Sequence, residues 1–380
     1  MKSRFTGELL ALFYAVCLLA GCAGKQPQAE VGENVPSAHS MELLYAKEFR
    51  VDYYGGGALI TINGTGSWFL LPEGGSVPEA LDKEIPILVQ PLDSIYLAAS
   101  SAMDFFSRLD ALDKVCLTST TYADWSLPEV KTALDSGELR YAGKYSAPDY
   151  ELILEQGTQL AIESTMIYHS PEISEQLEAL GIPVMVERSS YETHPLGRLE
   201  WIKLYGLLTG KEAEAQSFFD GQMGRLAPIL EAGGTEDGPT VAFFYISSNG
   251  YVNVRKPRDY ISKLIEMAGG RYVFADLDAG DNDLSTMNLQ MEAFYSGARD
   301  ADILIYNSTI DGELYTLDQL LQKSVLLADF KAFQAGNVWC TGKNMFQQTT
   351  GLGTLLTDLH QVISGQADGN MELTYLHRLT

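Results

Sequence analysis

The sequence predicts an α/β protein of two lobes, each with a mainly parallel sheet, joined by one long rigid helix. Short apolar runs alternate with helical patterns in two separate stretches of the chain, which is typical of βα units. The stretch between them has helical periodicity alone. With 380 residues, 46% of them hydrophobic, the chain is long enough for two cores. The predicted parts are a lobe at 41–195, a helical linker at 196–232 and a lobe at 233–380.

The N-terminus has the pattern of a secretion signal. Lys2 and Arg4 precede an apolar run, Leu9 to Ala20, which is shorter than the roughly 20 residues that a spanning helix needs. The run ends in Leu-Ala-Gly-Cys22, which resembles the lipobox of bacterial lipoproteins. Residues 1–21 are therefore predicted to be a lipoprotein signal peptide and Cys22 the lipidated residue; the alternative is an ordinary signal with an incidental cysteine. The polar stretch 22–40 contains Pro, Gly and Ser and is predicted to be a flexible tether.

The first lobe begins with a hairpin pattern. Two β-rich runs, 58–62 and 67–71, flank Asn63-Gly64-Thr65-Gly66, and Asn and Gly favour a tight turn. Strand and helix patterns then alternate, which predicts parallel pairing. The predicted strands are 87–89, 115–118, 159–163 and 182–186, and the predicted helices are 95–109, 151–156 and 171–180.

The linker and the second lobe follow in the same way. Apolar residues at helical spacing predict a helix at 196–208 and, after Thr209-Gly210, a second helix at 211–231 that would be about 30 Å long. Glycines between 233 and 238 end it. In the second lobe the predicted strands are 241–246, 303–306 and 337–340, and the predicted helices are 259–268, 289–296, 317–321 and 351–363.

Composition excludes several functions. There are 26 Lys and Arg against 50 Asp and Glu, a formal net charge of −24, which argues against nucleic-acid binding. Cys116 and Cys340 lie in apolar stretches and are predicted to be small buried side chains. The five histidines have no metal-ligand spacing, and the acidic stretch 276–281 is predicted to be a solvated loop rather than a calcium site. No catalytic or phosphate-binding motif is complete, so neither an enzyme nor a cofactor is predicted.

Two segments carry a family resemblance. Residues 147–154 (APDYELIL) followed by 159–162 (QLAI), and 288–295 (NLQMEAFY) followed by 300–305 (DADILI), resemble a segment found in the substrate-binding proteins of ABC importers for iron-siderophores, cobalamin and haem. The resemblance implies a class III periplasmic-binding-protein fold that holds a ferric siderophore, corrinoid or haem between its lobes. The family docks onto permease arginines with one glutamate per lobe, and the matching residues are Glu151 and Glu292; the alternative is that each only caps a helix.

The ligand site is expected where strand ends face the crevice between the lobes. The segment 188–198 leads into an H-P-L-G-R-x-E-W-I stretch that resembles a subset of the family; the alternative is that it only anchors the linker. Arg198 and Glu200 are predicted to form a local surface pair. The basic stretch 255–258 is predicted to clamp an anionic ligand, or to be a solvated loop. The predicted ligand-binding residues are Ser94, Tyr122, Trp125, Thr165, Arg188, Tyr191, His194, Tyr245, Arg255, Lys256 and Asn307.

The predicted partners follow from the same resemblance. The protein is expected to be an extracytoplasmic monomer on the outer face of the cell membrane, held there by lipid alone, which serves an ABC permease dimer and its ATPase. The stiff linker helix predicts a small hinge motion. A haem ligand would need an axial side chain, for which His194, Tyr122 or Tyr245 is conceivable. The alternative function is an extracytoplasmic enzyme or adhesion lipoprotein that reuses the two-lobed fold.

Overall fold

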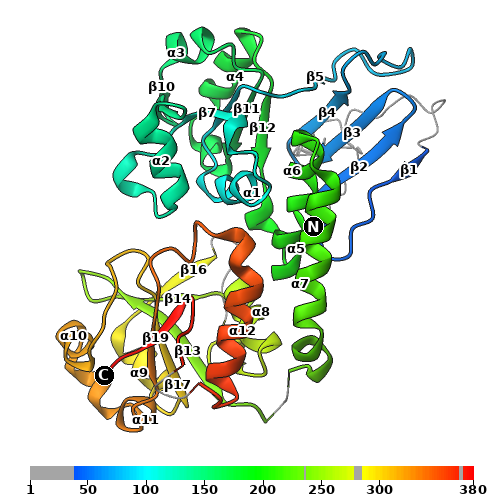
Figure 1. The fold of residues 1–380 in the computed structure, drawn as a ribbon. Helices are drawn as coiled ribbons and strands as arrows, with labels where there is room; N and C mark the ends of the chain where they lie inside the picture. The colour runs from blue at the N-terminus through cyan, green and yellow to red at the C-terminus, as the bar shows by residue number, and fades with distance from the viewer. Residues whose placement is uncertain (1–37, 235–236, 278–284, 368–370) are drawn as a thin grey trace, which may run out of the picture.

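The computed structural model describes residues 38–234, 237–277, 285–367 and 371–380. The predicted signal peptide, Cys22, nearly all of the tether and most of the acidic loop lie outside the described residues. Figure 1 shows two lobes, one above the other, with a long helix passing along one side of their junction and a separate N-terminal sheet beside it. The α/β class and the parallel sheets are as predicted.

The N-terminal sheet is a feature that the sequence did not separate from the first lobe. It contains five strands in sequential order, antiparallel except for the last pair. The predicted hairpin is confirmed, with Ile62 opposite Gly66 and Gly64 in the left-handed region. The strands are β1 (His39–Ser40), β2 (Phe49–Tyr54), β3 (Gly57–Ile62), β4 (Gly66–Leu71) and β5 (Ile87–Val89).

The first lobe is built on a parallel sheet with the order β12-β11-β6-β7-β8. These strands are β6 (Ile95–Leu97), β7 (Val115–Thr118), β8 (Arg140–Tyr141), β11 (Leu160–Ser164) and β12 (Val184–Glu187), and the short pair β9 (Gly143–Lys144) and β10 (Ala147–Pro148) lies apart. The helices are α1 (Met103–Arg108), α2 (Pro128–Ser136), α3 (Tyr150–Glu155) and α4 (Pro171–Ala179).

The helix predicted from residue 95 is wrong at its beginning. Ile95–Leu97 is instead the central strand β6, and helix α1 begins only at Met103. All three residues of β6 are fully buried, because a central parallel strand is covered on both faces. A short apolar run of this kind has no alternation that would distinguish a strand from a helix.

The linker contains three helices. The predicted helix 196–208 is divided at Trp201 into α5 (Pro195–Glu200) and α6 (Ile202–Thr209). Gly210, in the left-handed region, ends α6. The long helix is confirmed as α7 (Glu212–Ala232), whose 21 residues reach about 30 Å. It packs against α6 and against the last helix of the second lobe.

The second lobe has a mixed sheet with the order β16-β14-β13-β17-β18-β19, in which β13, β17 and β18 are parallel. The antiparallel strands were not predicted, and one of them contains Leu289, which was assigned to a helix. The strands are β13 (Thr240–Ile246), β14 (Val252–Arg255), β15 (Arg271–Tyr272), β16 (Thr286–Leu289), β17 (Ile303–Tyr306), β18 (Val338–Thr341) and β19 (Leu376–Arg378). The helices are α8 (Tyr260–Met267), α9 (Met291–Ala298), α10 (Leu317–Lys323), α11 (Lys331–Gln334) and α12 (Leu352–Ile363).

One carboxylate is buried in the first lobe without a partner. Glu163 of β11 is 0% exposed and lies on the same face of the sheet as Ala161, which pairs with Tyr96. Neither carboxylate oxygen of Glu163 forms a hydrogen bond within the described residues, and neither does the Tyr96 hydroxyl. Burial therefore raises the pKa of Glu163 from 4.5 to about 8.

This residue should give the protein a measurable pH dependence. Between pH 4.5 and about 8 the unfolded chain releases the Glu163 proton while the folded chain keeps it, so stability falls as the pH rises. Glu163→Gln should remove that loss and raise the free energy of unfolding at pH 8 by a few kcal/mol, as measured by urea denaturation from pH 4.5 to 8. The control is Glu155→Gln, an exposed residue of α3. Equal pH slopes in the wild type and Glu163→Gln would contradict the assignment.

Candidate ligand-binding site between the lobes

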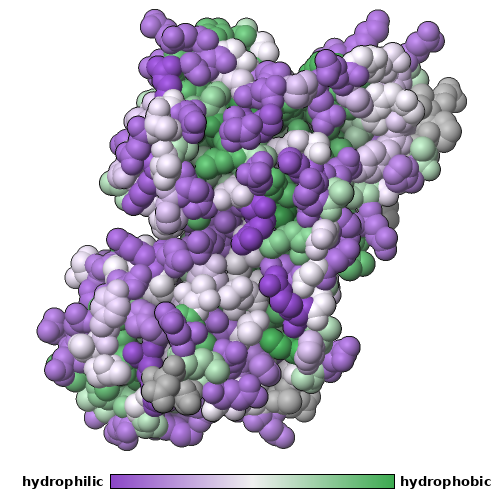
Figure 2. Space-filling model, in the orientation of Figure 1, coloured by the Kyte–Doolittle hydropathy of each residue, from purple (hydrophilic) through white to green (hydrophobic). Residues whose placement is uncertain are grey.

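The loops at the carboxyl ends of the parallel strands in the two lobes contact each other. Gln347, in the loop after β18, accepts hydrogen bonds at Oε1 from the backbone N and Oγ of Ser126, at 2.7 and 2.6 Å, and donates to the carbonyl of Asp124 at 2.7 Å. Thr349 donates to the carbonyl of Ser101, in the loop after β6, at 2.9 Å. We call this line of contact the interlobe seam; Figure 2 shows the waist between the two lobes in which it lies.

Exposed aromatic and apolar side chains occur at the same strand ends. Tyr122 follows β7 and is 47% exposed, while Met166 and Tyr168 follow β11 and are similarly exposed. Tyr251 is exposed in the turn after β13. Large side chains with this exposure can pack against a broad apolar ligand. Met166 and Tyr251 were missed, although their places directly after apolar strands were a signal for them.

Four predicted residues keep positions suited to ligand contact. Tyr122 and Thr165 lie in the segments that follow β7 and β11, at the seam side of the first lobe. Tyr191 and Tyr245 are partly exposed. The Tyr122 hydroxyl donates to Asp135 at 3.4 Å.

Three predicted residues are either covered by the protein or away from the seam. Ser94 lies before β6, at the amino end of the strand, because the run after it is a strand rather than a helix; its Oγ donates to the carbonyl of Gln156 at 2.9 Å. Trp125 is 2% exposed within the core and donates to the carbonyl of Thr120. Asn307 is buried and its side-chain oxygen accepts from Thr309. Trp125 and Asn307 are covered by the protein, because position after a strand does not determine which way a side chain points, and Ser94 is at the end of its strand away from the seam.

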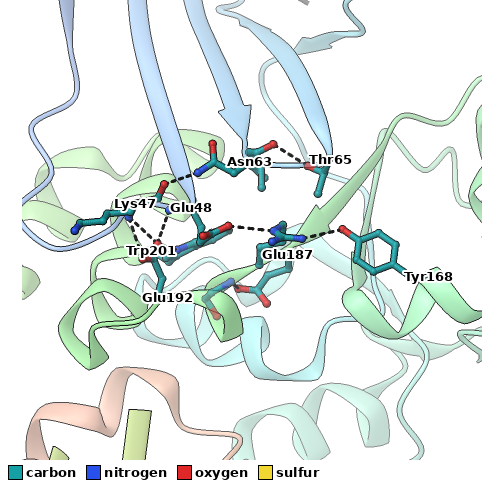
Figure 3. Close-up of polar contacts among 11 residues, drawn as sticks. Lys47, Glu48, Asn63, Thr65, Tyr168, Glu187, Glu192 and Trp201 are labelled. Atoms are coloured by element: carbon teal, nitrogen blue, oxygen red, sulfur yellow. Dashed lines mark hydrogen bonds and ion pairs between the residues drawn. The ribbon is translucent and has the colours of Figure 1, made fainter. Parts of the chain in front are cut away.

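Arg188 follows β12 as expected, but its charge is already neutralised. Its Nε donates to Glu48 at 3.2 Å, its Nη1 donates to the Tyr168 hydroxyl at 3.4 Å, and its guanidinium stacks on the Tyr191 ring at 4.0 Å. Figure 3 shows Glu48 and Tyr168 below the hairpin residues Asn63 and Thr65. Arg188 therefore connects the first lobe to the N-terminal sheet.

Two buried glutamates fasten the N-terminal segment to the linker. Glu200 accepts hydrogen bonds from the backbone N of residues 44, 45 and 46 at 2.8–3.0 Å. Glu192 accepts from the backbone N of residues 47 and 48 at 2.9–3.0 Å and from Trp201 Nε1 at 2.9 Å. Figure 3 shows Glu192 between Lys47, Glu48 and Trp201. We call Glu192 and Glu200 the carboxylate clamp.

The clamp corrects one prediction and explains a motif. Glu200 is 0% exposed and is paired with Lys203 at 2.9 Å, so it is not a surface partner of Arg198. Arg198 is itself buried and lies over the Tyr260 ring at 4.1 Å. A Cβ at Gly197 would lie 3.0 Å from Glu192 Oε2 and 3.1 Å from the carbonyl oxygen of Tyr45, so glycine leaves room for the segment. These contacts favour the interpretation that the motif anchors the linker.

His194 caps helix α5. Its Nδ1 accepts from the backbone N of Leu196 at 3.2 Å, and its ring stacks on Tyr45 at 4.5 Å. Burial lowers its pKa, with nearby Lys263 and Lys47 adding to the effect. The neutral ring supplies no positive charge to an anionic ligand.

The basic stretch of the second lobe is largely buried. Arg255 lies 3.6 Å from Asp259 and between the rings of Phe243 and Phe346. Lys256 is buried, and Arg258 is exposed. Burial raises the pKa of Asp259 while Arg255 acts in the opposite direction, as expected for a buried ion pair. The proposed anion clamp therefore has fewer available cations than its sequence indicates.

Comparisons with known proteins agree with this geometry. The sequence pattern of the periplasmic binding protein family matches residues 99–345. An uncharacterized lipoprotein of Methanocaldococcus jannaschii, MJ0878, is 25% identical over 343 residues, covering 83% of this chain and 79% of that protein.

Two solved structures are similar in fold. A periplasmic heme binding protein from Pseudomonas aeruginosa superposes with a TM-score of 0.58 at 16% identity, covering 76% of this chain and 98% of its own. An ABC-type Fe3+-hydroxamate transport protein from Saccharomonospora viridis has a TM-score of 0.54 at 20% identity. The match covers 72% of this chain and 93% of that protein. At these identities the similarity shows the fold, and it extends over most of both lobes. The predicted class III fold is thereby confirmed.

Removing half of the clamp should release the N-terminal segment. Glu200→Ala would leave three backbone amides and the buried Lys203 without their acceptor, which should lower the free energy of unfolding by about 3–5 kcal/mol. Hydrogen exchange should become faster at the amides of residues 44–46. The control is Glu214→Ala, an exposed residue of α7, which should change stability by less than about 0.5 kcal/mol. Unchanged amide protection in Glu200→Ala would contradict the clamp.

Proposed function

Because the chain belongs to the periplasmic binding protein family, we propose that it is an extracytoplasmic solute-binding lipoprotein of an ABC importer. It captures a large iron chelate, corrinoid or haem at the interlobe seam and delivers it to the permease without covalent chemistry. The observation that carries this proposal is the meeting of the two sets of strand-end loops, with exposed Tyr122, Met166 and Tyr168 beside them. The two similar structures, a periplasmic heme binding protein and an Fe3+-hydroxamate transport protein, support this ligand class.

The chemistry of the seam favours a ligand with a broad apolar surface and little net negative charge. The exposed side chains are mostly aromatic, and the two predicted cationic contacts, Arg188 and Arg255, are held by Glu48 and Asp259. A corrinoid or a ferric hydroxamate meets this description better than a ferric tris-catecholate, whose charge is strongly negative. For haem, His194 is an unsuitable axial ligand because its Nδ1 already accepts a hydrogen bond.

Attachment to the membrane is assigned to the lipid on Cys22. In the described parts of the chain, no helix is both long and apolar enough to cross a membrane. Loss of residues 1–21 would leave 24 basic and 49 acidic residues, a net charge of −25, which an anionic membrane surface repels. The lipoprotein relative supports this assignment.

Docking onto the permease is assigned to Glu151 and Glu292. Both residues are exposed in the first turn of a helix, one in each lobe. Asp149 already caps α3 by accepting from the backbone N of Leu152 at 3.0 Å, so Glu151 is not needed for that purpose. Neither glutamate forms an ion pair with another described residue. Each is therefore available to pair with a guanidinium.

A ligand panel tests the binding function. The full chain in detergent is unfolded thermally with cobalamin, a ferric trihydroxamate, a ferric tris-catecholate or haem, and a ligand at 100 times its Kd should add about 2.7 kcal/mol. Tyr122→Ala should weaken binding of the active ligand about tenfold by loss of stacking, whereas Tyr54→Ala in the N-terminal sheet should not change it. Absence of stabilisation by all four compounds would overturn the ligand class.

Charge reversal tests docking separately. Glu151→Lys with Glu292→Lys should reduce ligand uptake into cells or proteoliposomes at least tenfold, because repulsion replaces attraction at both permease contacts. The ligand Kd of the purified protein should stay the same. Glu155→Lys, at the other end of α3, is the control and should transport normally. Normal uptake by the double variant would refute the docking assignment.

A further inference from the structure

A cavity separate from the interlobe seam lies where the two lobes meet the long helix α7. Its volume is about 350 Å³, within the range of small-molecule sites. None of the proposed seam contacts lines it. We call it the hinge cavity. The lining residues that matter for its chemistry come from α1 (Asp104, Arg108), α7 (Gln222, Arg225) and the second lobe (Thr350, Tyr375).

The hinge cavity concentrates positive charge in an acidic protein. Arg108 and Arg225 both line it, and neither forms an ion pair with any residue that the structure describes. The 12-residue helix α12 begins at the cavity, and the dipole of a helix places partial positive charge at that end.

Buried polar groups in the cavity lack partners. Gln222 and Tyr375 are 6% and 5% exposed, yet within the described ranges neither the Gln222 amide nor the Tyr375 hydroxyl forms a hydrogen bond. Neither group is among the fully enclosed polar atoms without a partner, so both are accessible from the cavity that they line. Asp104 is equally buried; its Oδ2 accepts from the backbone N of Thr350 at 2.6 Å, while its Oδ1 has no partner among those residues. The cavity therefore presents free donors together with one free carboxylate oxygen.

We propose that the hinge cavity binds an oxyanion that carries a hydroxyl hydrogen at neutral pH, namely hydrogen phosphate. Arg108 and Arg225 neutralise the charge, and the Tyr375 hydroxyl and the Gln222 amide donate to phosphoryl oxygens. Asp104 Oδ1 accepts the P–OH hydrogen. Sulfate, which has no hydrogen at neutral pH, instead meets the carboxylate as a like charge and is disfavoured.

Titration calorimetry on the full chain in detergent at pH 7 tests the proposal. The probes are inorganic phosphate, glycerol 3-phosphate and sulfate at equal ionic strength. Phosphate should bind at least tenfold more tightly than sulfate, and more tightly than glycerol 3-phosphate, whose phosphoryl group mostly has no hydrogen at pH 7. Arg225→Gln should weaken phosphate binding at least fivefold. Arg299→Gln, an exposed arginine of α9 beside Asp300, should have no effect.

Two further variants separate this site from the others. Asp104→Asn should remove the preference for phosphate over sulfate, because an amide does not repel sulfate. Tyr122→Ala, which alters the seam, should leave phosphate binding unchanged, so failure of the import function and failure of this proposal are distinguishable. Equal affinity of the wild type for sulfate and phosphate, no phosphate binding, or unchanged binding in Arg225→Gln would each overturn the assignment.

Discussion

The carboxylate clamp is the interaction on which the arrangement of the molecule depends. Glu192 and Glu200 accept five successive backbone amides, residues 44–48, and thereby attach the N-terminal sheet to helix α5. Buried carboxylates are tolerated only when hydrogen bonds replace their water, and here Lys203 and Trp201 complete the set. The same attachment places Glu48 against Arg188, so the rim of the first lobe is fixed by the linker.

Local patterns were sufficient for most of the fold. The Asn63–Gly66 turn, the alternating strands and helices and the 21-residue α7 each have a signal within a short window. Strand β6 had none, because its three apolar residues do not alternate with polar ones and only small residues, without glycine or proline, separate them from the helix. The role of Glu200 was also out of reach, since its partners lie about 155 residues away in the chain.

The candidate site shows what sequence position can and cannot determine. Parallel strands place the residues after them on one edge of a sheet, which located Tyr122 and Thr165. The direction of each side chain depends on packing that no local pattern records, so Trp125 and Asn307 are in the core instead. Charge was misjudged for a related reason. Whether an arginine meets a carboxylate depends on tertiary packing, and Arg255 is held by Asp259 while Arg225 is in no ion pair with a described residue.

In the proposed lipoprotein, the clamp determines where a pull from the membrane enters the molecule. Residues 23–38 span at most about 55 Å when fully extended, and the chain that follows them is bonded to Glu200 of α5 and to Glu192 in the turn before it. A pull along the proposed tether would therefore load the N-terminal sheet and the linker, and not the seam between the lobes. The mechanical load of anchoring is in this way kept apart from the surfaces proposed to contact the ligand and the permease.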